Sequence, residues 1–142
     1  MDKTALFLKC VSFTNSVHRV THELTKNTKA NSITQVQYNI LEHIAVNQPV
    51  TISEISDCQH ISISNTSREL RKLSEKNLIE RMHSDEDRRK QYVRLSTDGQ
   101  TMMNEAFACI QSRFLDRIQN TSEEDLEEIK CALDILQTKL FY

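Results

Sequence analysis

The sequence predicts a mainly α-helical fold with one small β-hairpin, and three observations support this fold class. Apolar residues recur at helical spacing over long stretches near both ends of the 142-residue chain. Gly99 and Pro49 are its only glycine and proline, which is too few turn formers for a β-sandwich or barrel. Hydrophobic residues make up 38% and charged residues 27%, so a single domain with one modest core is expected.

Long, narrow apolar seams mark segments 1–30 and 97–142. One helix is expected in the first segment, a second from near Thr97, and a third after the capping residues Thr121 and Ser122. A chain of this size offers few internal partners for so much seam, so both segments are predicted to form a homodimer interface. The seam residues are Leu6, Cys10, Phe13, Val17, Val20 and Leu24, then Met103, Phe107, Ile110 and Phe114, then Leu126, Ile129, Leu133, Leu136 and Leu140.

Segment 33–96 is predicted to form a separate lobe. A helix is expected over residues 34–46, and Pro49 prevents its continuation. Residues 51–54, Thr-Ile-Ser-Glu, have the spacing of a capping box, which predicts a short helix that ends near Cys58. The inward-facing residues of the first of these helices are expected to be Tyr38, Leu41, Ile44 and Ala45.

A further helix and a hairpin complete this lobe. Ser62 is a good N-cap for the helix, and Asn77 is suited to the left-handed conformation at its end. Two extended runs follow at 78–83 and 91–95, separated by the charged loop 84–90. Two helices joined by a short turn form a helix-turn-helix, and the hairpin makes it winged. The residues expected to be buried in this helix are Ile63, Thr66, Leu70 and Leu73.

Charge is unevenly distributed, although the formal net charge is only −2. Residues 62–96 carry nine basic and six acidic side chains, whereas residues 97–142 carry four and nine. A basic middle segment suits a surface that meets phosphate, with a chance fluctuation as the alternative explanation. The candidate phosphate neutralisers are Lys72, Lys76, Arg88, Arg89, Lys90 and Arg94.

The helix that begins after Ser62 is the candidate DNA-reading element. Asn65 can pair with adenine and Arg68 with guanine, while the hydroxyls of Ser62 and Ser64 suit phosphate oxygens. An ordinary solvated face is the alternative, and the attached hairpin favours the reading of double-stranded DNA. The candidate DNA-binding residues of this helix are Ser62, Ser64, Asn65, Ser67, Arg68, Arg71 and Lys72.

The charged loop at the hairpin tip is a second candidate DNA contact. Asp85 or Asp87 is expected to pair locally with Arg88 or Arg89 and to stiffen the tip while another base reaches outward. An arginine inserted into a narrow minor groove is a recurrent source of affinity. The candidate wing residues are Asp87, Arg88, Arg89 and Lys90.

Several segments resemble the MarR family of winged helix-turn-helix regulators. Residues 73–81 (LSEKNLIER), 85–89 (DEDRR) and 93–99 (VRLSTDG) are similar to its helix-to-wing signature, and residues 33–41 (ITQVQYNIL) to its second helix. The dipeptide Ser67-Arg68 stands where the family usually has Thr-Arg.

The resemblance covers nearly all of residues 1–142 and implies a single domain. It implies a dimeric transcription regulator, most often a repressor, whose DNA affinity changes with a small ligand or with cysteine oxidation. It also places a minor-groove arginine at Arg89, with Asp87 as its orienting partner. Asn77 stands where the family usually has glycine, and asparagine tolerates the same conformation.

Several residues are candidates for sensing the signal that changes DNA affinity. The four cysteines lack any C-x-x-C pair, so free thiols are expected in a reducing cytoplasm. Cys10 lies where a peroxide-sensing branch of the family carries its reactive cysteine, but a thiol buried in the seam would be inert, which favours core filler. His18 and His22 have a spacing that can hold a metal, but no third ligand is evident and no metal is predicted.

Composition excludes other functional classes. One glycine cannot supply a glycine-rich phosphate loop, and no pattern suggests an activated nucleophile, so neither an enzyme nor a cofactor is expected. No apolar run approaches the roughly 18 residues of a membrane span, and Met1–Thr4 leads into no signal peptide, which favours the cytoplasm and no membrane partner.

The sequence therefore predicts a sequence-specific regulator that binds double-stranded DNA, acts as a repressor, and reads a near-palindromic operator as a homodimer. Release from DNA would follow the binding of a small-molecule effector or the oxidation of a cysteine. The alternative is a winged-helix module that binds or antagonises another protein without touching DNA.

Overall fold

The computed structural model describes residues 1–87 and 89–142, and within them it confirms the predicted mainly α fold with a small wing. Two compact units, Met1–Ile110 and Gln111–Tyr142, make up the chain, and α5 contributes to both. The helices are α1 (Lys3–Thr25), α2 (Gln35–Asn47), α3 (Ile52–Gln59), α4 (Ile63–Glu75), α5 (Thr97–Ile118) and α6 (Glu123–Lys139). The strands are β1 (Val50–Thr51), β2 (Ile79–His83) and β3 (Gln91–Leu95).

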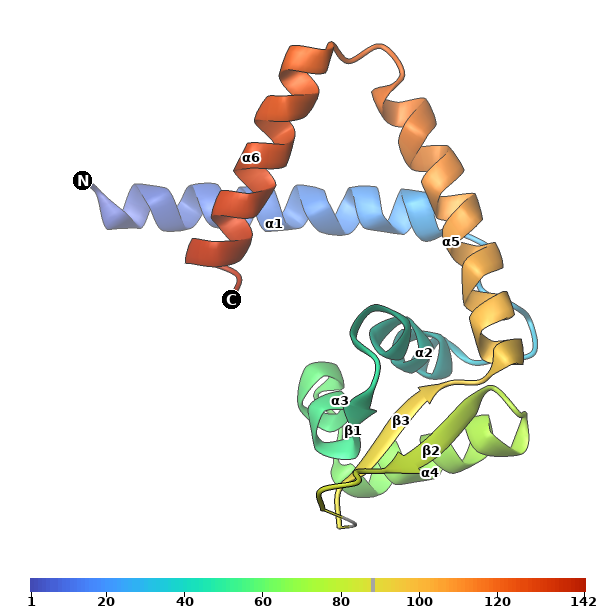
Figure 1. Ribbon diagram of the computed structural model, residues 1–142. Helices are drawn as coiled ribbons and strands as arrows, with labels where there is room; N and C mark the ends of the chain where they lie inside the picture. The colour runs from blue at the N-terminus through green and yellow to red at the C-terminus, as the bar shows by residue number, and fades with distance from the viewer. Residues whose placement is uncertain (88) are drawn as a thin grey trace. The chain divides into compact units, whose positions relative to one another are not determined.

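The core of the first unit lies where α2, α3 and α4 meet the sheet (Figure 1). Ile40, Ile55, Leu70 and Val93 come from four different elements and are completely buried. Tyr38, Leu41 and Ile44 are buried as predicted, whereas Ala45 is only half-buried. This shared core fixes α4 and the hairpin relative to each other.

Gln37 is buried on α2, which the sequence analysis did not anticipate. Its side-chain oxygen accepts from the backbone N–H of Thr34, and its own backbone N–H donates to the Thr34 hydroxyl, which closes a capping box. Its amide nitrogen donates to Glu69 of α4 at 3.1 Å. Burial of this amide is tolerated because both ends are hydrogen-bonded.

The turn between α3 and α4 is set by local hydrogen bonds. Thr51 and Glu54 form the predicted capping box at the start of α3. His60 then adopts a left-handed conformation with φ of 54°, which ends α3. Ser56 donates its hydroxyl to the carbonyl of Ile61 at 2.6 Å, which tightens the turn.

The predicted boundaries of α4 are confirmed, but one residue that was predicted to be buried is exposed. Ser62 caps the helix and Asn77 adopts the left-handed conformation with φ of 58°. Thr66, Leu70 and Leu73 are buried, whereas Ile63 is 58% exposed. Ile63 is the first helical residue, so its side chain lies beyond the end of the packed face.

The sheet is antiparallel, with strand order β1-β3-β2. The β2–β3 hairpin confirms the predicted wing, with Ile79 opposite Leu95 and His83 opposite Gln91. Strand β1 was not predicted, because two residues carry no detectable alternation. Val50 pairs with Val93 and is buried, so β1 attaches the start of α3 to the wing.

The helices with the long seams carry few buried residues. Neither α1 nor α6 contains a fully buried residue, and Leu6 and Leu133 are more than half exposed. On α5, Met103 is buried in the lobe while Phe114 is exposed. In the described part of the chain, no helix is both long enough and apolar enough to cross a membrane.

Candidate nucleic-acid interface

The solvent face of α4 carries the residues predicted to read DNA. Six of the seven candidates are exposed and Ser67 is half-buried. Leu70 and Leu73 anchor the opposite face in the core, so the polar face is held outward. The exposed candidates are Ser62, Ser64, Asn65, Arg68, Arg71 and Lys72.

The N-terminal end of α4 is ordered by Ser62. The Ser62 hydroxyl oxygen accepts from the backbone N–H of Asn65 at 3.1 Å, and the Thr66 hydroxyl donates to the Ser62 carbonyl at 2.9 Å. As an acceptor in the cap, the Ser62 hydroxyl keeps its own hydrogen for another partner. The first N–H groups of a helix point outward along its axis and favour an anion, such as a phosphate.

Three of the candidate phosphate neutralisers make contacts within the protein. Lys72 lies 3.4 Å from Glu69, and Lys76 donates to the carbonyl of Ser32 at 2.6 Å. Arg94 pairs with Glu80 across the hairpin at 2.9 Å. These contacts orient the cations, and binding to phosphate would have to compete with them.

The wing tip is hydrogen-bonded across its loop. Ser84 donates its backbone N–H to the carbonyl of Lys90, and its hydroxyl oxygen accepts from the N–H of Asp87. The carboxylate of Asp87 accepts from the backbone N–H of Arg89 at 3.0 Å. Asp87 therefore holds Arg89 through the main chain, which differs from the expected ion pair between the side chains.

This arrangement leaves the Arg89 and Lys90 side chains exposed at the tip. They line a hollow together with residues at the start of α3, including Ser53 and Glu54. The wing tip thus borders the start of the first helix of the helix-turn-helix. The candidate Arg88 lies outside the described residues.

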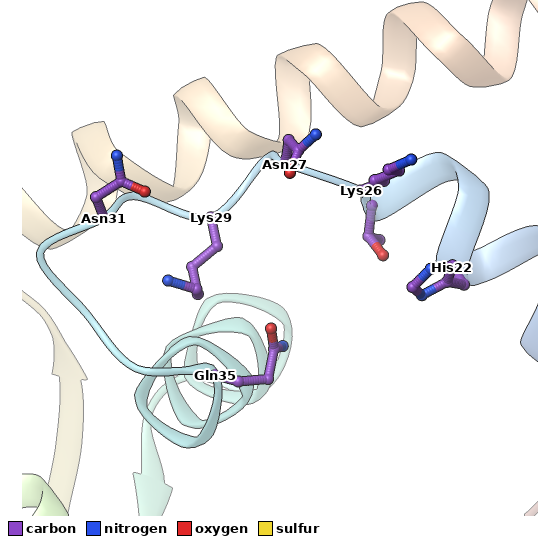
Figure 2. Close-up of a pocket in the computed structure, with 7 residues that line it drawn as sticks. His22, Lys26, Asn27, Lys29, Asn31 and Gln35 are labelled. Atoms are coloured by element: carbon purple, nitrogen blue, oxygen red, sulfur yellow. The ribbon is translucent and has the colours of Figure 1, made fainter.

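A separate polar cavity of about 710 Å³ lies at the C-terminal end of α1 and the loop that follows (Figure 2). Its lining includes two lysines and a histidine but no carboxylate. Lys29 donates to the carbonyls of Ala30 and Ile33, which fixes its position beside the start of α2. The lining residues are His22, Thr25, Lys26, Asn27, Lys29, Asn31 and Gln35.

The candidate sensor Cys10 is half-buried on α1, and Cys58, Cys109 and Cys131 are exposed. Cys10 is therefore not buried within a single chain, and the seam to which it belongs is the one predicted to pack against a second copy. Among residues 1–87 and 89–142, no three histidine, cysteine or acidic side chains are grouped for a metal ion.

The helix-turn-helix, its exposed polar second helix and the attached hairpin together define a winged helix-turn-helix protein. Residues 33–90, which contain these elements as far as the wing tip, match the model of the MarR family. The HTH-type transcriptional regulator TcaR of Staphylococcus aureus (strain Newman) is 24% identical over 131 residues, covering 90% of this chain and 86% of TcaR.

Two solved structures share the fold. MarR of S. aureus, in complex with salicylate and kanamycin, is 24% identical with a TM-score of 0.71, over 96% of this chain and 93% of that chain. FabT of Streptococcus pneumoniae, in complex with DNA, is 21% identical with a TM-score of 0.65, over 98% and 97%. The chain is therefore similar to the MarR family of transcriptional regulators, whose model it matches over residues 33–90. This similarity agrees with the predicted class, a DNA-binding regulator rather than an enzyme.

Proposed function

We propose that this protein is a repressor that binds a near-palindromic operator as a homodimer. The observation that carries the proposal is the presence, in one lobe, of an exposed polar α4 and a hydrogen-bonded wing tip that borders the start of α3. A regulator of this kind acts on chromosomal DNA, and its place of action is the cytoplasm.

Each element has a distinct task in the proposed complex. The N-terminal end of α4 enters the major groove, where Asn65 pairs with adenine and Arg68 with guanine. Ser62 and Ser64 donate to phosphate oxygens and set the depth of the helix. Arg89 at the wing tip enters the adjacent minor groove, where its charge is attracted by the narrow groove's potential.

The homodimer that matches the two-fold symmetry of the operator is expected to form through the seams. α1 and α6 expose Phe13, Val17, Ile129 and Leu133, and apolar surface of this extent favours a second copy of the chain. The predicted dimerisation segments are 1–30 and 97–142, and the reading lobe is 33–96. Two α4 helices then lie roughly 34 Å apart, one turn of B-DNA.

A small anion is the class of effector that the cavity beside α1 fits, because the cationic side chains of Lys26 and Lys29 both line it. The structural relative from S. aureus was solved with salicylate, a carboxylate. Salicylate should therefore weaken DNA binding, and its neutral amide should not. Lys26→Gln should reduce the salicylate response, whereas an unchanged response would exclude this cavity.

Cysteine oxidation is the second candidate for the input signal. Cys10 is half-buried in the predicted dimer seam, so a polar oxidised sulfur there would disturb the interface. Mild peroxide should release wild-type protein from DNA and leave Cys10→Ser bound. If wild-type binding is unaffected by peroxide, Cys10 has a packing role instead.

Fluorescence anisotropy with DNA from upstream of the protein's own gene tests the proposed function. We expect specific, salt-sensitive binding that a scrambled competitor does not displace. If this DNA binds no better than scrambled DNA, selection from genomic fragments should yield the operator.

Failure of both experiments would favour a winged-helix module that binds another protein. The internal contacts of Lys72, Lys76 and Arg94 favour this alternative, because they reduce the positive charge available to phosphate.

A further inference from the structure

Ile63 is the one exposed apolar residue on α4, a helix that the structure describes in full. Its side chain is 58% exposed, although its spacing with Thr66 and Leu70 would suit a core residue. The other exposed residues of this helix are polar or charged. The aliphatic side chain of Ile63 therefore stands next in sequence to polar residues that are candidates for DNA binding.

The position of Ile63 directs its side chain toward the tip of α4. It is the first helical residue after the Ser62 cap, and side chains on a helix lean toward the N-terminus. Ser64 and Asn65, which follow it, are exposed at the same end. A duplex that meets the N-terminal end of α4 along the helix axis therefore contacts Ile63 together with Ser64 and Asn65.

We propose that Ile63 is a specificity-determining residue that contacts the 5-methyl group of a thymine in each half-site. This inference rests on the proposed function and adds the base that α4 prefers at one position. Among the four bases, thymine alone presents a methyl group in the major groove. Burial of this methyl against Ile63 removes apolar surface of both partners from water, which favours thymine over cytosine.

The contact can be tested by removing only the methyl group. Each thymine of the selected operator is replaced in turn by deoxyuridine, in both half-sites, because deoxyuridine keeps the pairing and lacks the methyl. At one position we expect wild-type affinity to fall about fourfold per half-site. The Ile63→Ala variant should bind the unmodified operator more weakly and show no further loss at that position.

A matched variant controls for general effects on the lobe. Val46 on α2 is 71% exposed and lies outside the candidate interface, so Val46→Ala should keep the wild-type response to deoxyuridine. Circular dichroism should show that both variants are folded, because both side chains lie at the surface.

The inference is overturned if no thymine responds in the wild type, or if Ile63→Ala keeps the wild-type profile. Either result leaves specific operator binding intact, so it separates this inference from the proposed function. Absence of any preferred operator would instead overturn the proposed function and this inference together.

Discussion

Gly99 occupies a close backbone contact in the first turn of α5. A Cβ atom at this position would collide with the carbonyl oxygen of Leu78, which already accepts from the backbone N–H of Ser96. The atoms that this Cβ would meet all belong to the main chain of Leu78, a buried residue, so the site cannot relax easily. Glycine is required here for space rather than for backbone freedom.

Gly99→Ala should therefore destabilise the lobe, although alanine is the better helix former by about 1 kcal/mol. We expect the free energy of unfolding to fall by about 1–3 kcal/mol, as for overpacked sites. Urea denaturation measures this change, with Glu105→Ala on the exposed side of α5 as a control. Stability equal to that of the wild type would contradict the close contact.

Tyr38 is buried on α2, and burial raises the pKa of its hydroxyl to about 12, with the nearby Glu42 carboxylate adding to the shift. The unfolded chain releases this proton near pH 10, whereas the folded chain retains it to higher pH. Tyr38 should therefore stabilise the fold fully below pH 10 and progressively less as pH rises toward 12.

Tyr38→Phe should remove this part of the alkaline loss of stability. Comparison of urea denaturation at pH 8 and pH 11 for both proteins measures it. Glu42 and Thr28 lie near the hydroxyl, but neither meets the geometry of a hydrogen bond, so the variant should be nearly as stable as the wild type at pH 8. Equal alkaline losses in the two proteins would show that Tyr38 titrates normally.

Single residues show where the sequence was informative and where it was not. The spacing of Thr66, Leu70 and Leu73 correctly predicted the buried face of α4, but it also included Ile63. Periodicity gives a direction around a helix and does not show where the packed region ends. The buried Gln37 had a signal that was not used, because Thr34 and Gln37 have capping-box spacing.

At the scale of an element, the wing tip depends on one carboxylate. Asp87 accepts from the backbone N–H of Arg89, and Ser84 holds the other side of the loop. A carboxylate near DNA repels phosphate, so its value must come from ordering the loop. Order at the tip limits the conformations that Arg89 must lose on binding.

Asp87→Ala should therefore weaken operator binding although it removes a negative charge. Asp85→Ala removes the same charge from the same loop and should leave affinity unchanged or raise it. Anisotropy titrations of the two variants at one salt concentration separate the effect of the lost charge on DNA affinity from the effect of the lost loop order. If both variants bind more tightly than the wild type, electrostatics alone governs the wing.

Helix-capping residues predicted the helices of the lobe more reliably than sequence periodicity predicted its strands. Thr51, Ser62 and Asn77 each marked a boundary that the structure contains. The two-residue strand β1 gave no periodic signal, and its pairing with Val93 depends on a partner about forty residues away. The left-handed His60 was likewise not anticipated, since histidine adopts that conformation much less readily than glycine.

At the scale of the whole molecule, the seams predict an assembly that a single chain does not contain. Phe13 and Val17 on α1 are each 43% exposed, and both belong to the predicted seam. Sequence spacing identified these residues as apolar partners but could not show whether the partner lies in the same chain. Their exposure in one chain supports a second copy.

Phe13→Glu should shift the protein from dimer toward monomer, because it places a charge at the centre of an apolar seam. Ser12→Glu adds the same charge at the neighbouring exposed position and should leave the dimer intact. Sedimentation equilibrium gives the association constant of each variant. A monomeric wild-type protein, or equal association of the two variants, would contradict the seam as an interface.

The central claim is that α4 and the wing bind DNA as one surface, and the Arg68→Ala/Arg89→Ala variant tests it most directly. Both arginines are exposed, so the variant should stay folded and dimeric while specific operator binding is lost. A Lys3→Ala/Lys9→Ala variant removes the same charge from α1 and should retain specific binding. Normal operator affinity of the double-arginine variant would contradict the account of the reading surface.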